Sequence, residues 1–155
     1  MDSVIFARNL VKGRIVETIF AQMLRETGDF TVLEFGYEKI IPELVQQKDY
    51  GDIVETLRMA PDFVVINKKT KEVKLIEVKY QHTLSLDYVL RDAQRMSQSW
   101  NPSYLFIATL DGFYFDEINT IIENKGKISS LNHPQISKDL QNRYLQILID
   151  FEGKN

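Results

Sequence analysis

Three charged residues, Asp62, Glu77 and Lys79, stand beside or within apolar stretches of this chain. The stretches 63–66 and 73–78 are rich in β-branched and aromatic residues and are typical of buried strands, where a charge needs a reason. Carboxylate oxygens are the ligands that Mg²⁺ and Mn²⁺ prefer, and a lysine near such an ion can orient or activate a water molecule. These residue types therefore indicate metal-assisted hydrolysis.

The polar segment 67–71 predicts a β-hairpin whose register places Asp62 directly opposite Glu77. The apolar pairs that follow from this register agree with it: Val64 with Leu75, Ile66 with Val73, and Phe63 with Ile76. Two opposed carboxylates about 5 Å apart repel each other, and a divalent cation between them is the simplest remedy. Lys79 shares the face of Glu77, because side chains two residues apart on a strand point the same way.

The tripeptide Glu-x-Lys occurs four times, at 72–74, 77–79, 123–125 and 152–154. Only the second follows an apolar strand, faces an acidic residue across the hairpin and leads into a helix. The alternative for Glu77 and Lys79 is an ion pair on the surface of an edge strand, without a metal.

A further carboxylate, Glu17, lies in a segment with apolar residues at helical spacing, Ile15, Val16, Ile19, Phe20, Met23 and Leu24. In a helical projection Glu17 lies at the margin of this apolar stripe, from which it can reach the sheet. Its alternative fate is to point into water. Arg14, Thr18, Gln22 and Arg25 face away from the stripe.

An early helical Glu17, then Pro61-Asp62, then Glu77-Val78-Lys79 and a helix together resemble the PD-(D/E)XK nuclease superfamily, with its restriction-endonuclease-like fold, over roughly residues 12–109. The resemblance implies that Asp62, Glu77 and the backbone carbonyl of Val78 bind Mg²⁺ or Mn²⁺. It also implies that Glu17 assists through the metal or its water, and that Lys79 orients or activates that water.

The branch of the superfamily stays open between resolvase-like and RecB-like members. The segment around Glu17 is similar to the first helix of both. RecB-like members tend to carry Gln followed by Tyr four residues later in the next helix, whereas here Gln94 is followed by Gln98.

The elements that must position these residues alternate between helices and strands, and they predict a single domain, 1–155. Expected are a helix at 4–25, a strand at 30–37, a partly helical insertion at 42–59, the hairpin, a helix from Ser85 to Asn101-Pro102, a strand at 104–109, a helix at 116–123 and a strand at 143–151. This order predicts an α/β fold, a restriction-endonuclease-like core (αβββαβ) with a central mixed sheet flanked by helices. The strands at 73–80 and 104–109 should be parallel, because a helix connects them.

Composition narrows the function further. The 155 residues are 44% hydrophobic and 26% charged, and they include no cysteine and two histidines. Disulfides, thiol catalysis and thiolate metal sites are excluded, which leaves oxygen ligands for a metal. No apolar run approaches a membrane span and no secretion signal is evident, so we expect a cytoplasmic protein that does not enter a membrane.

The sequence thus favours a metal-dependent nuclease, acting on DNA more than on RNA. With a formal net charge of −3, we expect a local patch, a second subunit or a partner protein to hold the substrate, and a homodimer would suit cleavage of two strands. Candidate contacts to nucleic acid are Lys68, Lys69, Arg91, Gln94 and Arg95, with a solvated surface as their alternative. The competing function is a catalytically inactive nuclease-fold module for nucleic-acid binding or protein assembly.

Overall fold

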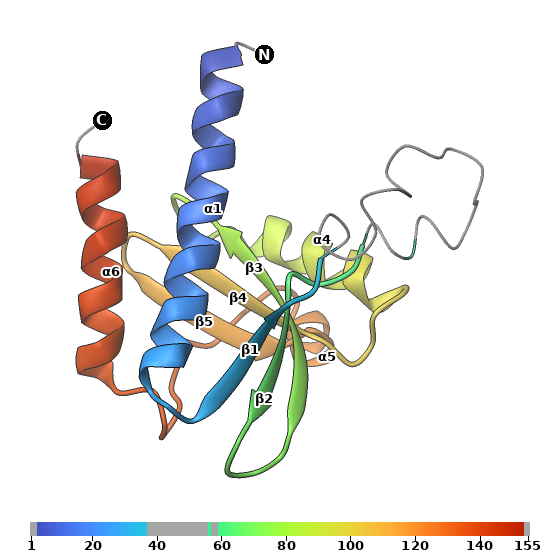
Figure 1. Ribbon diagram of the computed structural model, residues 1–155. Helices are drawn as coiled ribbons and strands as arrows, with labels where there is room; N and C mark the ends of the chain where they lie inside the picture. Colours follow the sequence, from blue (N-terminus) through green and yellow to red (C-terminus); the bar gives the residue numbers. More distant parts are fainter. Residues whose placement is uncertain (1–2, 37–55, 57–58, 154–155) are drawn as a thin grey trace, which may run out of the picture.

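The computed structural model describes residues 3–36, 56 and 59–153 (Figure 1). The predicted insertion at 42–59 therefore lies outside the described residues, apart from Thr56 and Met59. Within the described part the chain forms nine elements: α1 (Ser3–Glu26), β1 (Phe30–Glu34), β2 (Phe63–Asn67), β3 (Val73–Tyr80), α4 (Leu86–Ser97), β4 (Tyr104–Thr109), β5 (Gly112–Glu117), α5 (Ile118–Glu123) and α6 (Lys138–Gly153).

The five strands form one mixed sheet in the order β1-β2-β3-β4-β5. Strands β3 and β4 are parallel, as predicted for two strands joined through a helix, and the other neighbours are antiparallel. The hairpin register is also confirmed, with Phe63 opposite Ile76, Val64 opposite Leu75 and Ile66 opposite Val73. Lys71 closes the turn at a φ of 68°, and the N–H of Asn67 donates to the carbonyl of Glu72 at 2.9 Å.

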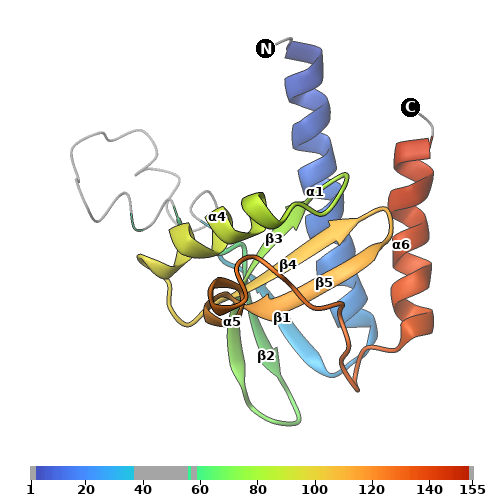
Figure 2. The same ribbon diagram turned by 180° about the vertical axis from the view of Figure 1, so that it is seen from behind.

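Helices cover both faces of the sheet. Helices α1 and α6 lie side by side on one face, and α4 and α5 cover the other, as the two opposite views show (Figures 1 and 2). Alternate residues of β4 serve the two layers: Phe106 and Ala108 pack toward α1 and α6, whereas Leu105 and Ile107 pack toward α4 and α5. The molecule is thus an α/β sandwich of three layers.

The two helices nearest β3 begin and end where the sequence suggests. Helix α1 buries the predicted apolar stripe and ends before Gly28, which adopts a φ of 75°. The hydroxyl of Ser85 accepts a hydrogen bond from the N–H of Tyr88 and so caps α4 as expected. None of the described helices has the length and apolar character that crossing a membrane requires.

Two predicted elements are wrong. Residues 143–151, predicted as a strand, belong to helix α6, in which Leu140, Tyr144 and Leu148 face the core at helical spacing. The predicted helix at 116–123 begins two residues later, because Asp116 and Glu117 still belong to β5, which pairs with β4 through a tight turn. Strand β1 ends at Glu34, earlier than predicted.

Candidate functional site

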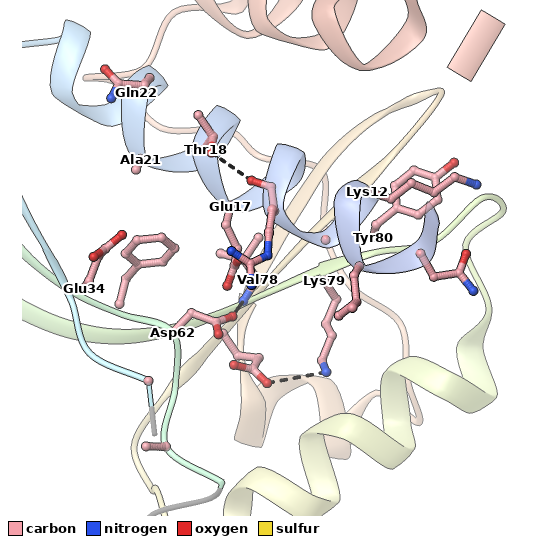
Figure 3. Close-up of a pocket in the computed structure, with 18 of the residues that line it drawn as sticks. Lys12, Glu17, Thr18, Ala21, Gln22, Glu34, Asp62, Val78, Lys79 and Tyr80 are labelled. Carbon is pink, nitrogen blue, oxygen red and sulfur yellow. Dashed lines mark hydrogen bonds and ion pairs between the residues drawn. The ribbon is translucent and has the colours of Figure 1, made fainter. Parts of the chain in front are cut away.

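An open cleft of about 1160 Å³ lies between the polar side of α1 and the edge where the β2–β3 pairing ends. It is lined by the sequence-predicted residues Glu17 from α1, Asp62 just before β2, and Glu77, Val78 and Lys79 from β3 (Figure 3). The structure therefore brings together residues that are up to 62 positions apart, as the resemblance implied. The cleft itself had no signal in the sequence.

Asp62 is held against β3 by its neighbours. The backbone N–H of Val78 donates a hydrogen bond to Oδ2 of Asp62 at 2.9 Å. On the other side, the carbonyl of Asp62 accepts from the N–H of Phe35 at 2.8 Å, so the end of β1 also fixes the aspartate backbone. The carboxylate is consequently set in one orientation before any ligand arrives.

Pro61 leaves the carbonyl of Val78 without the N–H donor that a strand partner usually provides. Continuing the β2–β3 register by two pairs from Phe63 and Ile76 places Pro61 opposite Val78. In an antiparallel ladder such a residue exchanges both its N–H and its C=O with its partner, but proline has no N–H to donate. Its own carbonyl accepts from Gly36. The N–H of Val78 donates instead to the side chain of Asp62. The C=O of Val78 points to the same edge of β3, and Pro61 has no N–H to donate to it.

Glu77 is the most strongly perturbed group in the cleft. Its side chain is 14% exposed, and Nζ of Lys79 lies 3.5 Å from its Oε2. Burial, followed by the negative charge of Asp62, raises the pKa of Glu77 to about 8, although Lys79 and Arg95 act in the opposite direction. The repulsion expected between the opposed carboxylates of Asp62 and Glu77 is therefore present, and the ammonium group of Lys79 does not cancel it.

A hard divalent cation fits this donor set. Asp62 and Glu77 offer carboxylate oxygens, Val78 offers a carbonyl with no ladder donor, and Mg²⁺ commonly uses one or two carboxylates while keeping several waters. Within the part of the chain that the structure describes, no three Asp, Glu or His side chains gather closely enough to hold a metal by themselves. The backbone carbonyl and water must therefore complete any coordination shell.

Helix α1 contributes more to the cleft than the sequence suggested. Arg14, Thr18, Gln22 and Arg25, expected to face away from the apolar stripe, line the cleft together with Glu17. The side of α1 opposite its apolar stripe is therefore a wall of the cleft.

The cleft is also lined by residues outside the predicted site, among them Lys12, Tyr80 and His82. Nζ of Lys12 lies over the ring of Tyr80, 5.5 Å from its centroid, and the Tyr80 hydroxyl is 3.5 Å from Nδ1 of His82. Tyr80 directly follows Lys79 on β3, so these side chains extend the cleft beyond the carboxylates. Sequence order along β3 was the signal that could have found Tyr80.

The five predicted nucleic-acid contacts do not line the cleft. Lys68 and Lys69 lie in the β2–β3 turn, at the opposite end of the hairpin, and Lys69 pairs with Asp29 at 3.5 Å. On α4, Arg91 stacks over the ring of Tyr88, and Arg95 pairs with Asp92 at 3.3 Å. Gln94 lies on the exposed side of the same helix. Arg95 alone acts electrostatically on Glu77.

No protein-family model matches this chain, and no curated protein sequence matches it either.

Proposed function

We propose that the protein is a metal-dependent nuclease of the PD-(D/E)XK type with a restriction-endonuclease-like fold, acting on DNA in preference to RNA. The proposal rests on one observation: Asp62, Glu77, Lys79 and the carbonyl of Val78 meet at the end of a buried hairpin, in an open cleft. The preference for DNA follows from the resemblance of the Glu17, Asp62 and Glu77-Val78-Lys79 motif to that superfamily.

Each group has a role in hydrolysis of a phosphodiester. Asp62, Glu77 and the Val78 carbonyl would hold Mg²⁺ or Mn²⁺, which supplies a water of lowered pKa and stabilises negative charge on the phosphoryl oxygens. Lys79 donates a hydrogen bond to the attacking water or to a phosphoryl oxygen. Glu17, on the facing wall, accepts a hydrogen bond from the water and limits the directions from which it attacks.

The cleft also suits a polyanionic substrate. Arg14 and Arg25 line it beside the carboxylates, whereas Lys12 there pairs with Glu152, so the two arginines give the wall formed by α1 positive charge although the whole chain has a net charge of −3. Cations that contact phosphates position a nucleic acid without reading its sequence. This local patch replaces the surface lysines of the hairpin turn as the expected substrate contact.

Hydrolysis of labelled single-stranded, duplex and branched DNA, and of RNA, tests the proposal. With Mg²⁺ or Mn²⁺ we expect cleavage that EDTA abolishes. Asp62→Asn and Lys79→Met should each lower the rate about 100-fold or more, because each removes a group that acts on the reacting atoms.

The chain contains its own matched control. Glu72, just before β3, and Lys74 form a second Glu-x-Lys with a similar ion pair, at 3.4 Å, outside the cleft. Glu72→Gln and Lys74→Met should leave cleavage unchanged. Equal activity of Lys79→Met and Lys74→Met would overturn the site assignment. Absence of cleavage of every substrate, with no thermal response to either metal, would favour the inactive binding or assembly module instead.

A further inference from the structure

The first turns of α1 expose an unusual number of large apolar side chains. Between 46% and 72% of the surface of each is exposed: Val4, Ile5, Phe6, Leu10 and Val11. At 1.5 Å per residue α1 is about 36 Å long and α6 about 24 Å, so α1 extends about two turns farther. The views from front and back both show the start of α1 standing clear of the sheet (Figures 1 and 2).

An apolar groove of about 450 Å³ lies beside this projecting end, between α1 and α6. Its apolar lining comes from both helices: Val11, Ile15, Ile19, Tyr144 and Ile147. Ile147 on α6 is itself 49% exposed. The apolar residues that α1 contributes to the groove lie about 160° from Glu17 in the helical projection, whereas Arg14, Thr18 and Gln22 line both the groove and the cleft.

The projecting end of α1 and the groove both present apolar side chains, and both belong to the same chain. A helix end that exposes large apolar side chains gains stability when an apolar surface packs on it. A two-fold axis allows the end of one copy to fill the groove of another, and the reverse, in a closed arrangement.

Charge agrees with a pairing of α1 with α6. Lys12 with Glu152 and Glu26 with Arg143 already pair α1 with α6 within one copy, so the charges open to a second copy are others. Arg14 lies at the edge of the groove, and the exposed Asp150 is one turn beyond Ile147. Opposite charges thus meet when α1 of one copy crosses α6 of the other.

We propose that the exposed surface of α1 and the α1–α6 groove are the contact between two copies of this chain, which form a two-fold dimer. The first turns of α1 in each copy lie in the groove of its partner. A stable contact usually buries on the order of 800 Å² per partner, and the exposed apolar side chains of α1 and the groove would contribute to that area. The dimer carries two candidate sites, one in each copy.

Sedimentation velocity between about 1 and 100 µM, without metal or nucleic acid, tests this proposal independently of nuclease activity. The wild-type chain should sediment as a dimer of 18.1 kDa protomers. Val11→Asp and Ile147→Asp should each raise the dimer dissociation constant at least tenfold. Leu86→Asp, on α4 and 48% exposed, is the matched control for Ile147 and should not change it. Circular dichroism spectra confirm that each variant is folded.

Three results would overturn the dimer. The wild type sediments as a monomer at every concentration, or both aspartate variants dimerise as tightly as the wild type, or Leu86→Asp dissociates the dimer equally. A monomer that co-sediments with vesicles of phosphatidylserine and phosphatidylcholine, and loses this binding in Val11→Asp, would assign the surface to a lipid membrane instead.

Discussion

At the scale of the residue, Glu77 links the cleft to the stability of the protein. Its carboxyl group ionises near pKa 4.5 in the unfolded chain, while burial and Asp62 raise its pKa to about 8 in the folded one. Between these values the folded state binds a proton that the unfolded state has lost. This contribution is therefore complete below pH 4.5 and is lost as the pH rises through 8, a change on the order of a few kcal/mol.

We expect the metal-free protein to lose thermal stability from pH 5 to pH 8, and Glu77→Gln to remove most of this slope. The amide has the same shape and cannot ionise. Thermal unfolding in EDTA at several pH values measures the effect, and Glu72→Gln, just before β3 and exposed, should keep the wild-type slope. A Glu77→Gln variant with an unchanged slope would show that another group carries it.

The individual residues of the hairpin were well predicted, because the strand period of two fixes which side chains share a face. Asp62 and Glu77 met as the register required. The carbonyl of Val78 entered only through the resemblance, yet Pro61, read together with the register, provides a physical reason for it. Arg14 and Arg25 were missed because a polar helix face is the same in sequence whether it borders a cleft or bulk water.

At the scale of the element, one glycine determines how α4 and α5 pack. Gly126 follows α5 at a φ of 98°, and an added Cβ would overlap the carbonyl oxygen of Leu86 and lie 3.2 Å from Cβ of Leu90. Gly126→Ala should therefore destabilise the protein by about 2–4 kcal/mol, from backbone strain and from overlap with a fixed carbonyl. Chemical denaturation measures the loss.

Gly13 provides the contrast within α1. An added Cβ there meets no atom within 4 Å, and the residue lies inside a helix. Gly13→Ala should raise the free energy of unfolding by about 0.5–1 kcal/mol, through the better helix propensity of alanine. Destabilisation by Gly13→Ala similar to that of Gly126→Ala would contradict this account of both positions.

Elements were predicted well where their pattern was unambiguous and poorly where an apolar run fitted two periods. The run from Tyr144 to Ile149 satisfies a buried strand as well as a helix, and Leu140 and Leu148 at helical spacing decided for α6. Strand β5 was missed because Asp111-Gly112 was taken as the end of a strand rather than as the turn of a hairpin. Tertiary pairing with β4 is what fixes it.

At the scale of the whole molecule, α1 connects the candidate site to the rest of the fold. It packs on β3 and on α6, and ion pairs join the two helices at both ends: Lys12 with Glu152 at 3.2 Å and Arg143 with Glu26 at 2.8 Å. The first pair is largely buried, and Lys12 also contacts Tyr80 on β3. A ligand bound between α1 and β3 therefore acts on contacts that hold the layer together.

Metal binding should consequently be visible in global unfolding. A ligand that binds only the folded state stabilises it by RT ln(1 + [L]/Kd), about 2.7 kcal/mol at 100 times the Kd, which corresponds to about 5–10 °C for a chain of this size. We expect Mn²⁺ to raise the melting temperature more at pH 8 than at pH 6, because the metal must displace the proton of Glu77.

Differential scanning calorimetry of the full chain with and without Mn²⁺ measures this shift in melting temperature. Asp62→Asn combined with Glu77→Gln should abolish it, whereas Glu72→Gln should retain it. An equal shift in the double variant and the wild type would show that Asp62 and Glu77 do not hold the cation.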